Sequence, residues 1–233
     1  MKSDELLAPE IVSCSQNHCA TVKDGKAYAW AICSNKRGNR FGQLCRPSNK
    51  QGGGKSGGIQ ERKEVDGLGD VVGVAAGGSR DSGHTLFVNL VGQVFACGCD
   101  RWQQLGLGSP EAGAVGYSWQ GKLWHKRPQH IFALKDVVSV AAGDDHSVAL
   151  LKSGEVWTWG RGEHGQLGHQ GKPFVMPPTK SSVLTDSGDR KLIKAEGNCS
   201  ATFSAEDGTL LKHVGRCPKI LLKRWGVNIL MCK

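Results

Sequence analysis

Short runs of apolar and β-branched residues, separated by turn residues, dominate the chain from residue 11 onward. The clearest example is VVSVAAGDDHSVALLKSGEVWTWG at 137–160, where Asp144-Asp145 and Ser153-Gly154 interrupt three such runs. Runs of this length and composition between turn residues are typical of β-strands. A serine-glycine pair between two of the runs predicts a tight hairpin. The segment is therefore expected to form a small antiparallel sheet.

The same pattern recurs along the chain with fixed internal spacing. Each unit places a histidine seven or eight residues before a hairpin glycine: His18 before Gly25, His84 before Gly92 and His146 before Gly154. In a fourth unit Ser200 takes the histidine position, eight residues before Gly208. Constant offsets inside units of varying separation indicate a repeat architecture with insertions in the loops.

The repeats divide the chain into a lead, a repeat region and a tail. The repeat region is expected over 11–211, after a lead at 1–10 and before a basic tail without repeat signal at 212–233. The four units occupy 11–44, 71–106, 137–168 and 192–211, with loop insertions at 46–66 and 108–127. A sheet of this size cannot bury both of its faces alone, so neighbouring units must stack.

A longer motif gives the repeat a family resemblance. The pattern A-G-x-x-H-S-x-A-L-x-x-x-G-x-V-W-x-W-G at 142–160, followed by G-Q-L-G at 165–168, resembles the regulator of chromosome condensation repeat. The resemblance implies an all-β fold, a β-propeller whose blades are antiparallel four-stranded sheets. It also implies that 128–131 and 178–181 supply each blade's remaining strand. Such propellers usually have seven blades, so about three to four blades form an incomplete propeller.

Charge and cysteine content refine this interpretation. The net charge is +9, but 208–233 holds no acidic residue and six basic ones: Lys212, Arg216, Lys219, Lys223, Arg224 and Lys233. Without them the charge is 9 − 6 = +3, so a nucleic-acid or chromatin partner rests on this tail alone. No apolar run is long enough to span a membrane, and the first residues lack a secretory pattern. Nine cysteines without a C-x-x-C pair predict reduced cysteines in an intracellular protein of the cytoplasm or nucleus.

Candidate chemical sites are few. The Gly52–Ser56 segment GGGKS lacks the first glycine of a phosphate-binding loop, because position 49 is asparagine, so no nucleotide cofactor is expected. The spacing of Cys14, His18 and Cys19 fits no standard zinc motif, and no metal is expected. The repeated His18, His84 and His146 are predicted to be structural and to bond backbone at the blade turn, as Gly92 and Gly154 are predicted to form hairpins. No residues suggest a catalytic triad, so the chain is not expected to be an enzyme.

The favoured function is therefore a protein-binding scaffold. Charged residues that blade packing does not require lie in two loops, and Arg101, Arg161, Glu163 and His164 are the predicted partner-binding residues. The resemblance leaves two alternatives open. One is guanine-nucleotide exchange on a small GTPase such as Ran, the activity of the family's founding member, and the other is a chromatin-associated regulator.

Overall fold

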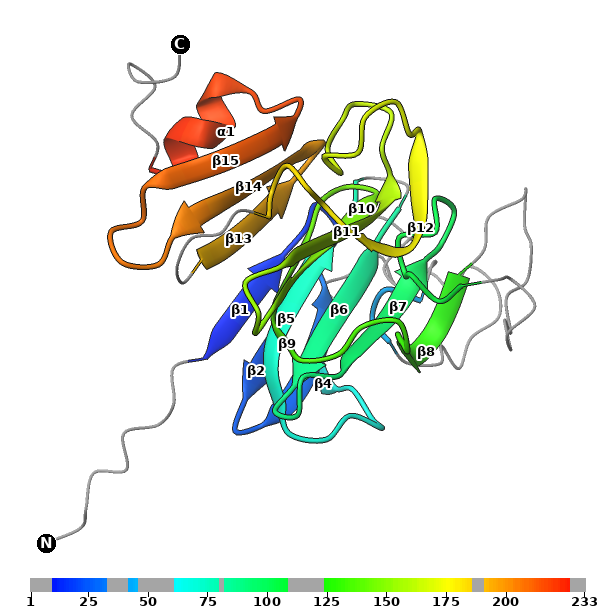
Figure 1. Ribbon diagram of the computed structural model, residues 1–233. Helices are drawn as coiled ribbons and strands as arrows, with labels where there is room; N and C mark the ends of the chain where they lie inside the picture. The colour runs from blue at the N-terminus through cyan, green and yellow to red at the C-terminus, as the bar shows by residue number, and fades with distance from the viewer. Residues whose placement is uncertain are drawn as a thin grey trace, which may run out of the picture.

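The computed structural model describes residues 10–32, 42–45, 61–79, 82–108, 124–185 and 191–226. In these ranges the protein is built from four antiparallel sheets, which we number as blades in chain order (Figure 1). Blade one contains β1 (Ile11–Cys14), β2 (His18–Lys23), β3 (Lys26–Ala31) and β4 (Lys63–Glu64). Blade two contains β5 (Val71–Gly77), β6 (His84–Asn89), β7 (Val94–Cys99) and β8 (Trp124–His130).

Blades three and four complete the described fold. Blade three contains β9 (Val137–Ala142), β10 (His146–Leu151), β11 (Val156–Arg161) and β12 (Phe174–Lys180). Blade four has three strands, β13 (Lys191–Glu196), β14 (Cys199–Ser204) and β15 (Leu210–Gly215), and is followed by α1 (Lys219–Arg224). The predicted all-β propeller of antiparallel blades is confirmed. No helix in the described ranges has the length and apolar character that crossing a bilayer requires.

The hairpin glycines sit where the backbone needs them. Gly92 and Gly154 have φ of +78° and +84°, a conformation that side chains disfavour. A Cβ at Gly92 would also lie 2.9 Å from the Cα of Asp136, whereas the space around Gly154 is open. Gly92 is thus constrained by both conformation and packing, and Gly154 by conformation alone.

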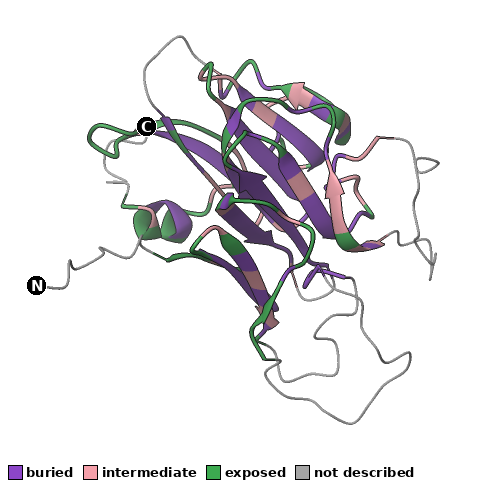
Figure 2. Ribbon diagram, turned by 90° about the horizontal axis from the view of Figure 1, so that it is seen from below, coloured by how far each residue is buried: buried purple, intermediate pink, exposed green. Residues whose placement is uncertain are grey.

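Side chains on alternate faces of each sheet pack against the neighbouring blades. Leu86 and Val88 of blade two meet Ala149 and Trp159 of blade three in one buried cluster. The opposite face of blade two packs Phe87 against blade one. Blade three in turn contacts Ile193 of blade four. Figure 2 shows the buried residues running through the interior of the stacked sheets, so the core consists of successive blade interfaces.

The register corrects the predicted histidine position of the fourth unit. His84 pairs with Gly98, and His146 pairs with Gly160. The residue that pairs with the matching Gly215 is Cys199, not Ser200. The sequence offset misled because the turn between β14 and β15 is one residue longer than its counterparts: the Gly208 N–H bonds the Ser204 carbonyl four residues back, whereas the Gly154 N–H bonds the Leu151 carbonyl three residues back.

Two further expectations differ from the structure. Strand β15 runs to Gly215, past the repeat boundary drawn at Leu211, so the first residues of the basic tail belong to blade four. Six cysteines, expected to be reduced, are joined in three disulfides: Cys14–Cys19, Cys45–Cys97 and Cys199–Cys217. The spatial pairing is invisible in the sequence because Cys45 and Cys97 lie 52 residues apart and meet only when blades one and two stack.

The segment after β15 covers the face of blade four that points away from blade three. Phe203 and Ala201 lie on that face and are almost fully buried. The Trp225 ring packs edge-on against Phe203 with centroids 5.9 Å apart, and the Arg224 guanidinium pairs with Glu196. The helix itself is buried on one side through Leu221 and Leu222. A short helical segment therefore stands where another blade would stack.

Candidate functional site: a loop cluster across blades two and three

The blades are joined by a repeated polar contact. His18 Nε2 lies 2.8 Å from Thr85 Oγ1 of blade two, and that hydroxyl donates to the Gln43 carbonyl at 2.7 Å. His84 Nε2 repeats the contact with Ser147 Oγ of blade three at 3.0 Å. Ser147 Oγ in turn donates to the carbonyl of Gln104 at 2.7 Å. Because each hydroxyl proton is used on a carbonyl, the hydroxyl accepts the histidine Nε2–H.

The third histidine extends the series to blade four. His146 Nε2 lies 2.8 Å from Ser200 Oγ. We expected each histidine to bond backbone at its own blade turn. Instead, the Nε2 atom of each ring bonds a side-chain hydroxyl of the next blade. The partner was hidden from the sequence because it lies more than fifty residues downstream.

Burial fixes the charge state of these histidines. All three are fully buried, and desolvation lowers the pKa of His18 to about 3, of His84 to about 4 and of His146 to about 3. The rings are therefore neutral near pH 7 and act as hydrogen-bond donors inside the blade interfaces. Their positions deep in three separate interfaces exclude a shared catalytic or metal centre.

Each of two surface turns is anchored by a buried glutamine. In the turn after β7, Gln104 Oε1 accepts the Trp102 N–H at 2.8 Å. In the turn after β11, Gln166 Oε1 accepts the His164 N–H at 2.9 Å. In the first turn Asp100 also accepts the Leu105 N–H at 2.9 Å. Burial raises the pKa of that carboxyl to about 7, opposed by the Leu105 N–H bond. Each turn is thus rigidly tied to buried groups.

These anchored turns bring a cluster of charged and aromatic side chains together. The Arg161 guanidinium lies 4.5 Å from the centre of the Trp102 ring, and that of Arg101 lies 5.4 Å from it. Arg161 also pairs with Asp145 and with Glu163, with distances of 3.4 Å and 2.5 Å. We call Arg101, Trp102, Asp145, Arg161 and Glu163 the loop cluster. Cation–π contacts and a carboxylate on each side hold Arg161 in one orientation.

The structure therefore assembles three of the four predicted binding residues, Arg101, Arg161 and Glu163. His164 lies on the same turn and is half-buried. Trp102 and Asp145 were missed. A signal for Trp102 existed, because aligning the two turns on Gln104 and Gln166 places it opposite His164, whereas Asp145 directly precedes the buried His146.

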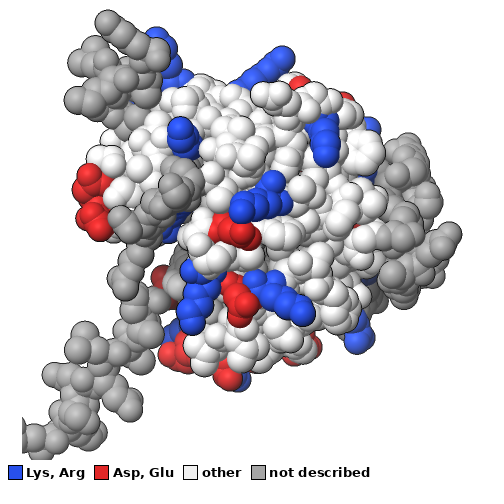
Figure 3. Space-filling model, in the orientation of Figure 1, with Lys and Arg blue, Asp and Glu red and all other residues white. Residues whose placement is uncertain are grey.

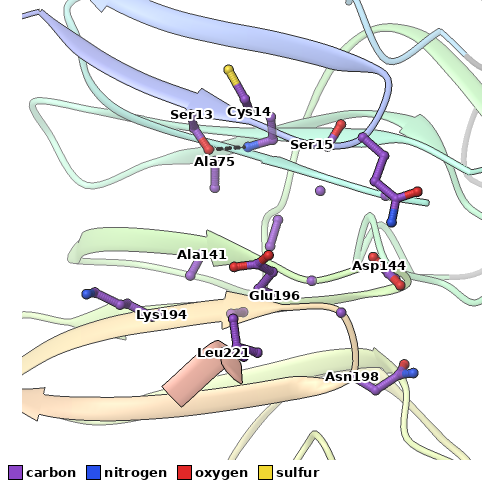
Figure 4. A pocket seen from close by; sticks show the side chains of 18 of the residues that line it. Ser13, Cys14, Ser15, Ala75, Ala141, Asp144, Lys194, Glu196, Asn198 and Leu221 are labelled. Atoms are coloured by element: carbon purple, nitrogen blue, oxygen red, sulfur yellow. Dashed lines mark hydrogen bonds between the residues drawn. The ribbon is translucent and has the colours of Figure 1, made fainter. Parts of the chain in front are cut away.

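A separate hollow of about 1100 Å³ lies between the innermost strands β1, β5, β9 and β13 and α1. Figure 4 shows its lining of small side chains such as Ala75 and Ala141, with Lys194 and Glu196 on one side and Leu221 of α1 closing it. Ser13 Oγ accepts the Ala76 N–H at 2.9 Å and so joins β1 to β5. Of the charged residues in this lining, Glu196 is paired with Arg224 and the Lys194 ammonium lies 5.0 Å from the centre of the Phe203 ring, so the hollow presents no converging set of uncommitted polar atoms.

Other candidate sites resolve simply. Cys14 and Cys19 are bonded to each other, and His18 is committed to Thr85, so the three do not form a metal site. Among the described residues no group of three His, Cys, Asp or Glu side chains is arranged to hold a metal ion. The Gly52–Ser56 segment lies outside the described residues.

Comparison with known proteins agrees with this geometry. The family models described as "Regulator of chromosome condensation (RCC1) repeat" match residues 91–150, 137–166 and 153–202. The chain belongs to the regulator of chromosome condensation repeat family. The "Regulator of chromosome condensation" of Mus musculus is 30% identical over 183 residues, which are 72% of this chain and 39% of that protein. The "Probable E3 ubiquitin-protein ligase HERC3" of Homo sapiens is 32% identical over 182 residues, 76% of this chain and 15% of the relative.

Solved structures of the repeat family share the fold. The structure of Prp20p from Saccharomyces cerevisiae, described with its binding properties to Gsp1p and histones, superposes with a TM-score of 0.63 at 20% identity. It covers 93% of this chain, which spans 46% of that protein. Human WBSCR16 gives a TM-score of 0.59 at 22% identity, with coverages of 84% and 44%. The chain thus spans less than half of each of these relatives.

Proposed function

We propose that the chain is a non-catalytic, protein-binding propeller module that uses the loop cluster as its recognition surface. The observation that carries the proposal is the Trp102 ring lying within 5.4 Å of the guanidinium groups of both Arg101 and Arg161, which come from two different blades. Tryptophan and arginine are the residues that most often dominate binding energy at protein interfaces. Here both are held on rigid turns, so little conformational entropy is lost on binding.

The partner's chemistry follows from the cluster. Arg161 is bound by Asp145 and Glu163 on this chain, while Arg101 is exposed beside Trp102. A partner side chain that stacks on Trp102 and carries a carboxylate for Arg101 fits this arrangement. The cluster itself combines two arginines with two carboxylates, which favours a mixed protein surface over a polyanion as its partner. Figure 3 shows basic and acidic side chains interspersed over the described part of one face of the molecule as well.

The experiment compares affinity capture by the full chain and by two variants, with bound proteins counted by quantitative mass spectrometry. Trp102→Ala and Arg101→Ala should each reduce recovery of the specific partner about tenfold or more. The matched control is Arg127→Ala, which removes an exposed arginine from β8 away from the cluster. Equal recovery by all four proteins contradicts the proposal.

A second candidate is guanine-nucleotide exchange on a small GTPase, because Prp20p, which shares the fold, is described with its binding properties to Gsp1p. Release of labelled GDP from Ran and other small GTPases tests it directly. The proposal expects no acceleration at substoichiometric amounts of the chain. Acceleration that Trp102→Ala abolishes would instead assign exchange to this same cluster.

The chromatin alternative rests on the basic residues after Gly208. Of these, Arg224 is already paired with Glu196, and Lys233 lies outside the described residues. Binding to duplex DNA that falls steeply between low and moderate salt, and that Lys219→Glu weakens, would favour this alternative. We expect no such sequence-independent binding at physiological salt.

A further inference from the structure

Blade four lacks the outer strand that its three predecessors possess. Strands β4, β8 and β12 pair with the outer edge of β3, β7 and β11, but among the described residues no strand pairs with the corresponding edge of β15. The difference shows in burial. Strands β7 and β11 are buried along almost their whole length, whereas Leu211, Lys212 and His213 of β15 are exposed.

An unpaired edge presents a row of backbone donors and acceptors that another extended segment can pair with. In Figure 1, β15 is the outermost strand of its sheet. The α1 segment is held against this sheet through Trp225 on Phe203 of β14 and through the Cys199–Cys217 disulfide. The helix therefore covers a face of blade four and leaves the edge of β15 without a strand partner.

Charge selects the occupant of this edge. From β15 into α1 the residues Lys212, His213, Arg216 and Lys219 follow one another without an acidic residue, whereas Glu206 and Asp207 lie in the turn before the strand. In blades two and three the outer strand places His130 opposite Phe95 and Lys180 opposite Trp157. When Gly215 is aligned with Gly98 and Gly160, Lys212 takes the position of Phe95 and Trp157. A new strand there would set its side chain directly opposite a lysine, where a carboxylate is favoured and a like charge is not.

We propose that the free edge of β15 binds an extended acidic segment of a partner protein as the fourth strand of blade four. This surface is distinct from the loop cluster. A second copy of the chain is a poor occupant, because antiparallel pairing of two β15 edges would place Lys212 and His213 against one another. Proline is acceptable in the incoming strand, since Pro128 of β8 and Pro177 of β12 occupy the equivalent outer strands.

The test uses the full chain and a labelled peptide that copies residues 174–181 with Met176, Thr179 and Lys180 replaced by glutamate. Fluorescence polarisation should show saturable binding. A peptide with lysine at the same three places should not bind. The acidic peptide with alternate backbone amides N-methylated should also fail, because N-methylation removes strand pairing and keeps the charge.

Charge reversal on the edge provides the protein-side test. The double variant Lys212→Glu with His213→Glu should weaken peptide binding about tenfold or more. The matched control Lys152→Glu changes an exposed lysine in the outer turn of blade three and should bind normally. Hydrogen exchange of the wild-type chain gives a readout that needs no variant: the peptide should slow exchange in β15 and leave β11 unchanged.

Several outcomes would overturn the proposal. Equal binding of the N-methylated peptide would show charge attraction without strand pairing. Protection of amides outside β15 would move the site elsewhere, and absence of binding would remove it. A concentration-dependent dimer that the edge variant dissociates and the peptide does not would assign the edge to a second copy instead.

Discussion

Blades three and four begin with the same repeat and end differently. In blade three the histidine reaches forward to Ser200 of the next blade, and a fourth strand covers β11. In blade four Cys199 stands at the histidine position and is bonded to Cys217, while β15 remains uncovered. The comparison teaches that the histidine serves the interface between two consecutive blades, which we call the joint. Where the described chain has no following blade, a local crosslink and a short helix take over the exposed face.

The largest effect that tests this comparison is expected at Gly143, at the joint of blades three and four. A Cβ there would overlap the His146 ring and lie 2.8 Å from the Gly197 carbonyl. Gly143→Val should cost about 4 kcal/mol or more and leave little soluble, cooperatively folding protein. The control Gly69→Val places its side chain in open space and should unfold at nearly the wild-type urea midpoint. Similar midpoints for both variants would contradict close packing at this joint.

The next largest loss of stability distinguishes the histidine contact between blades three and four from the disulfide in blade four. His146→Ala removes a buried ring and leaves Ser200 without its donor, so we expect a loss of about 3 kcal/mol in any redox buffer. Cys199→Ser should cost about 3 kcal/mol only under oxidising conditions, because its contribution depends on the bond to Cys217. Urea unfolding with and without reductant measures both. A redox-dependent loss in the His146 variant would show that the two ends are not independent.

A smaller effect is expected from pH. The three joint histidines have a folded-state pKa far below 6.5, so the unfolded chain binds more protons and stability falls as pH drops below 6.5. Asp100 acts oppositely, because burial raises its pKa to about 7 and protonation below that value favours the folded state. From pH 7.5 to 5.5 the histidines cost about 4 kcal/mol and Asp100 returns about 2, a net loss of about 2 kcal/mol.

Urea midpoints at pH 7.5, 6.5 and 5.5 measure this dependence. His146→Asn should flatten the curve by the share of one histidine, and Asp100→Asn should steepen it. A stability that rises on acidification in the wild-type chain would show that the joint histidines are charged in the folded state.

The smallest effect on stability is expected in the loop cluster. Arg161 is partly exposed, and its pair with Glu163 lies at the surface, while its pair with Asp145 is long at 3.4 Å and only part-buried. Arg161→Ala should therefore change the free energy of unfolding by less than about 1 kcal/mol. A thermal melt checks this. A loss as large as that of His146→Ala would make Arg161 a structural residue of the joint and remove it from the recognition surface.

The sequence predicts much of the blades and little of their joints. Strand positions, hairpin glycines such as Gly92 and the repeat motif at 137–168 are local patterns and can be found one unit at a time. The hydroxyl that bonds His84 cannot be found in this way, because Ser147 lies in the next unit. The fourth unit was misaligned by one residue, since the longer turn before Gly208 makes Ser200 match the eight-residue offset of the other units. In the candidate site, charge pointed to Arg101 and Arg161, but only the stacking of two blades shows that both lie beside the Trp102 ring.

The repeated joint has a consequence for how such a chain changes over evolutionary time. Every described blade interface uses a histidine on one side and a serine or threonine hydroxyl on the other, so consecutive blades pack through the same hydrogen bond. Duplication or loss of a whole unit by recombination would therefore leave a histidine facing a hydroxyl at the new blade interface. Among the described units, the fourth alone carries a different residue at this position, Cys199, so a unit placed after it would meet a disulfide-bonded cysteine instead of a histidine.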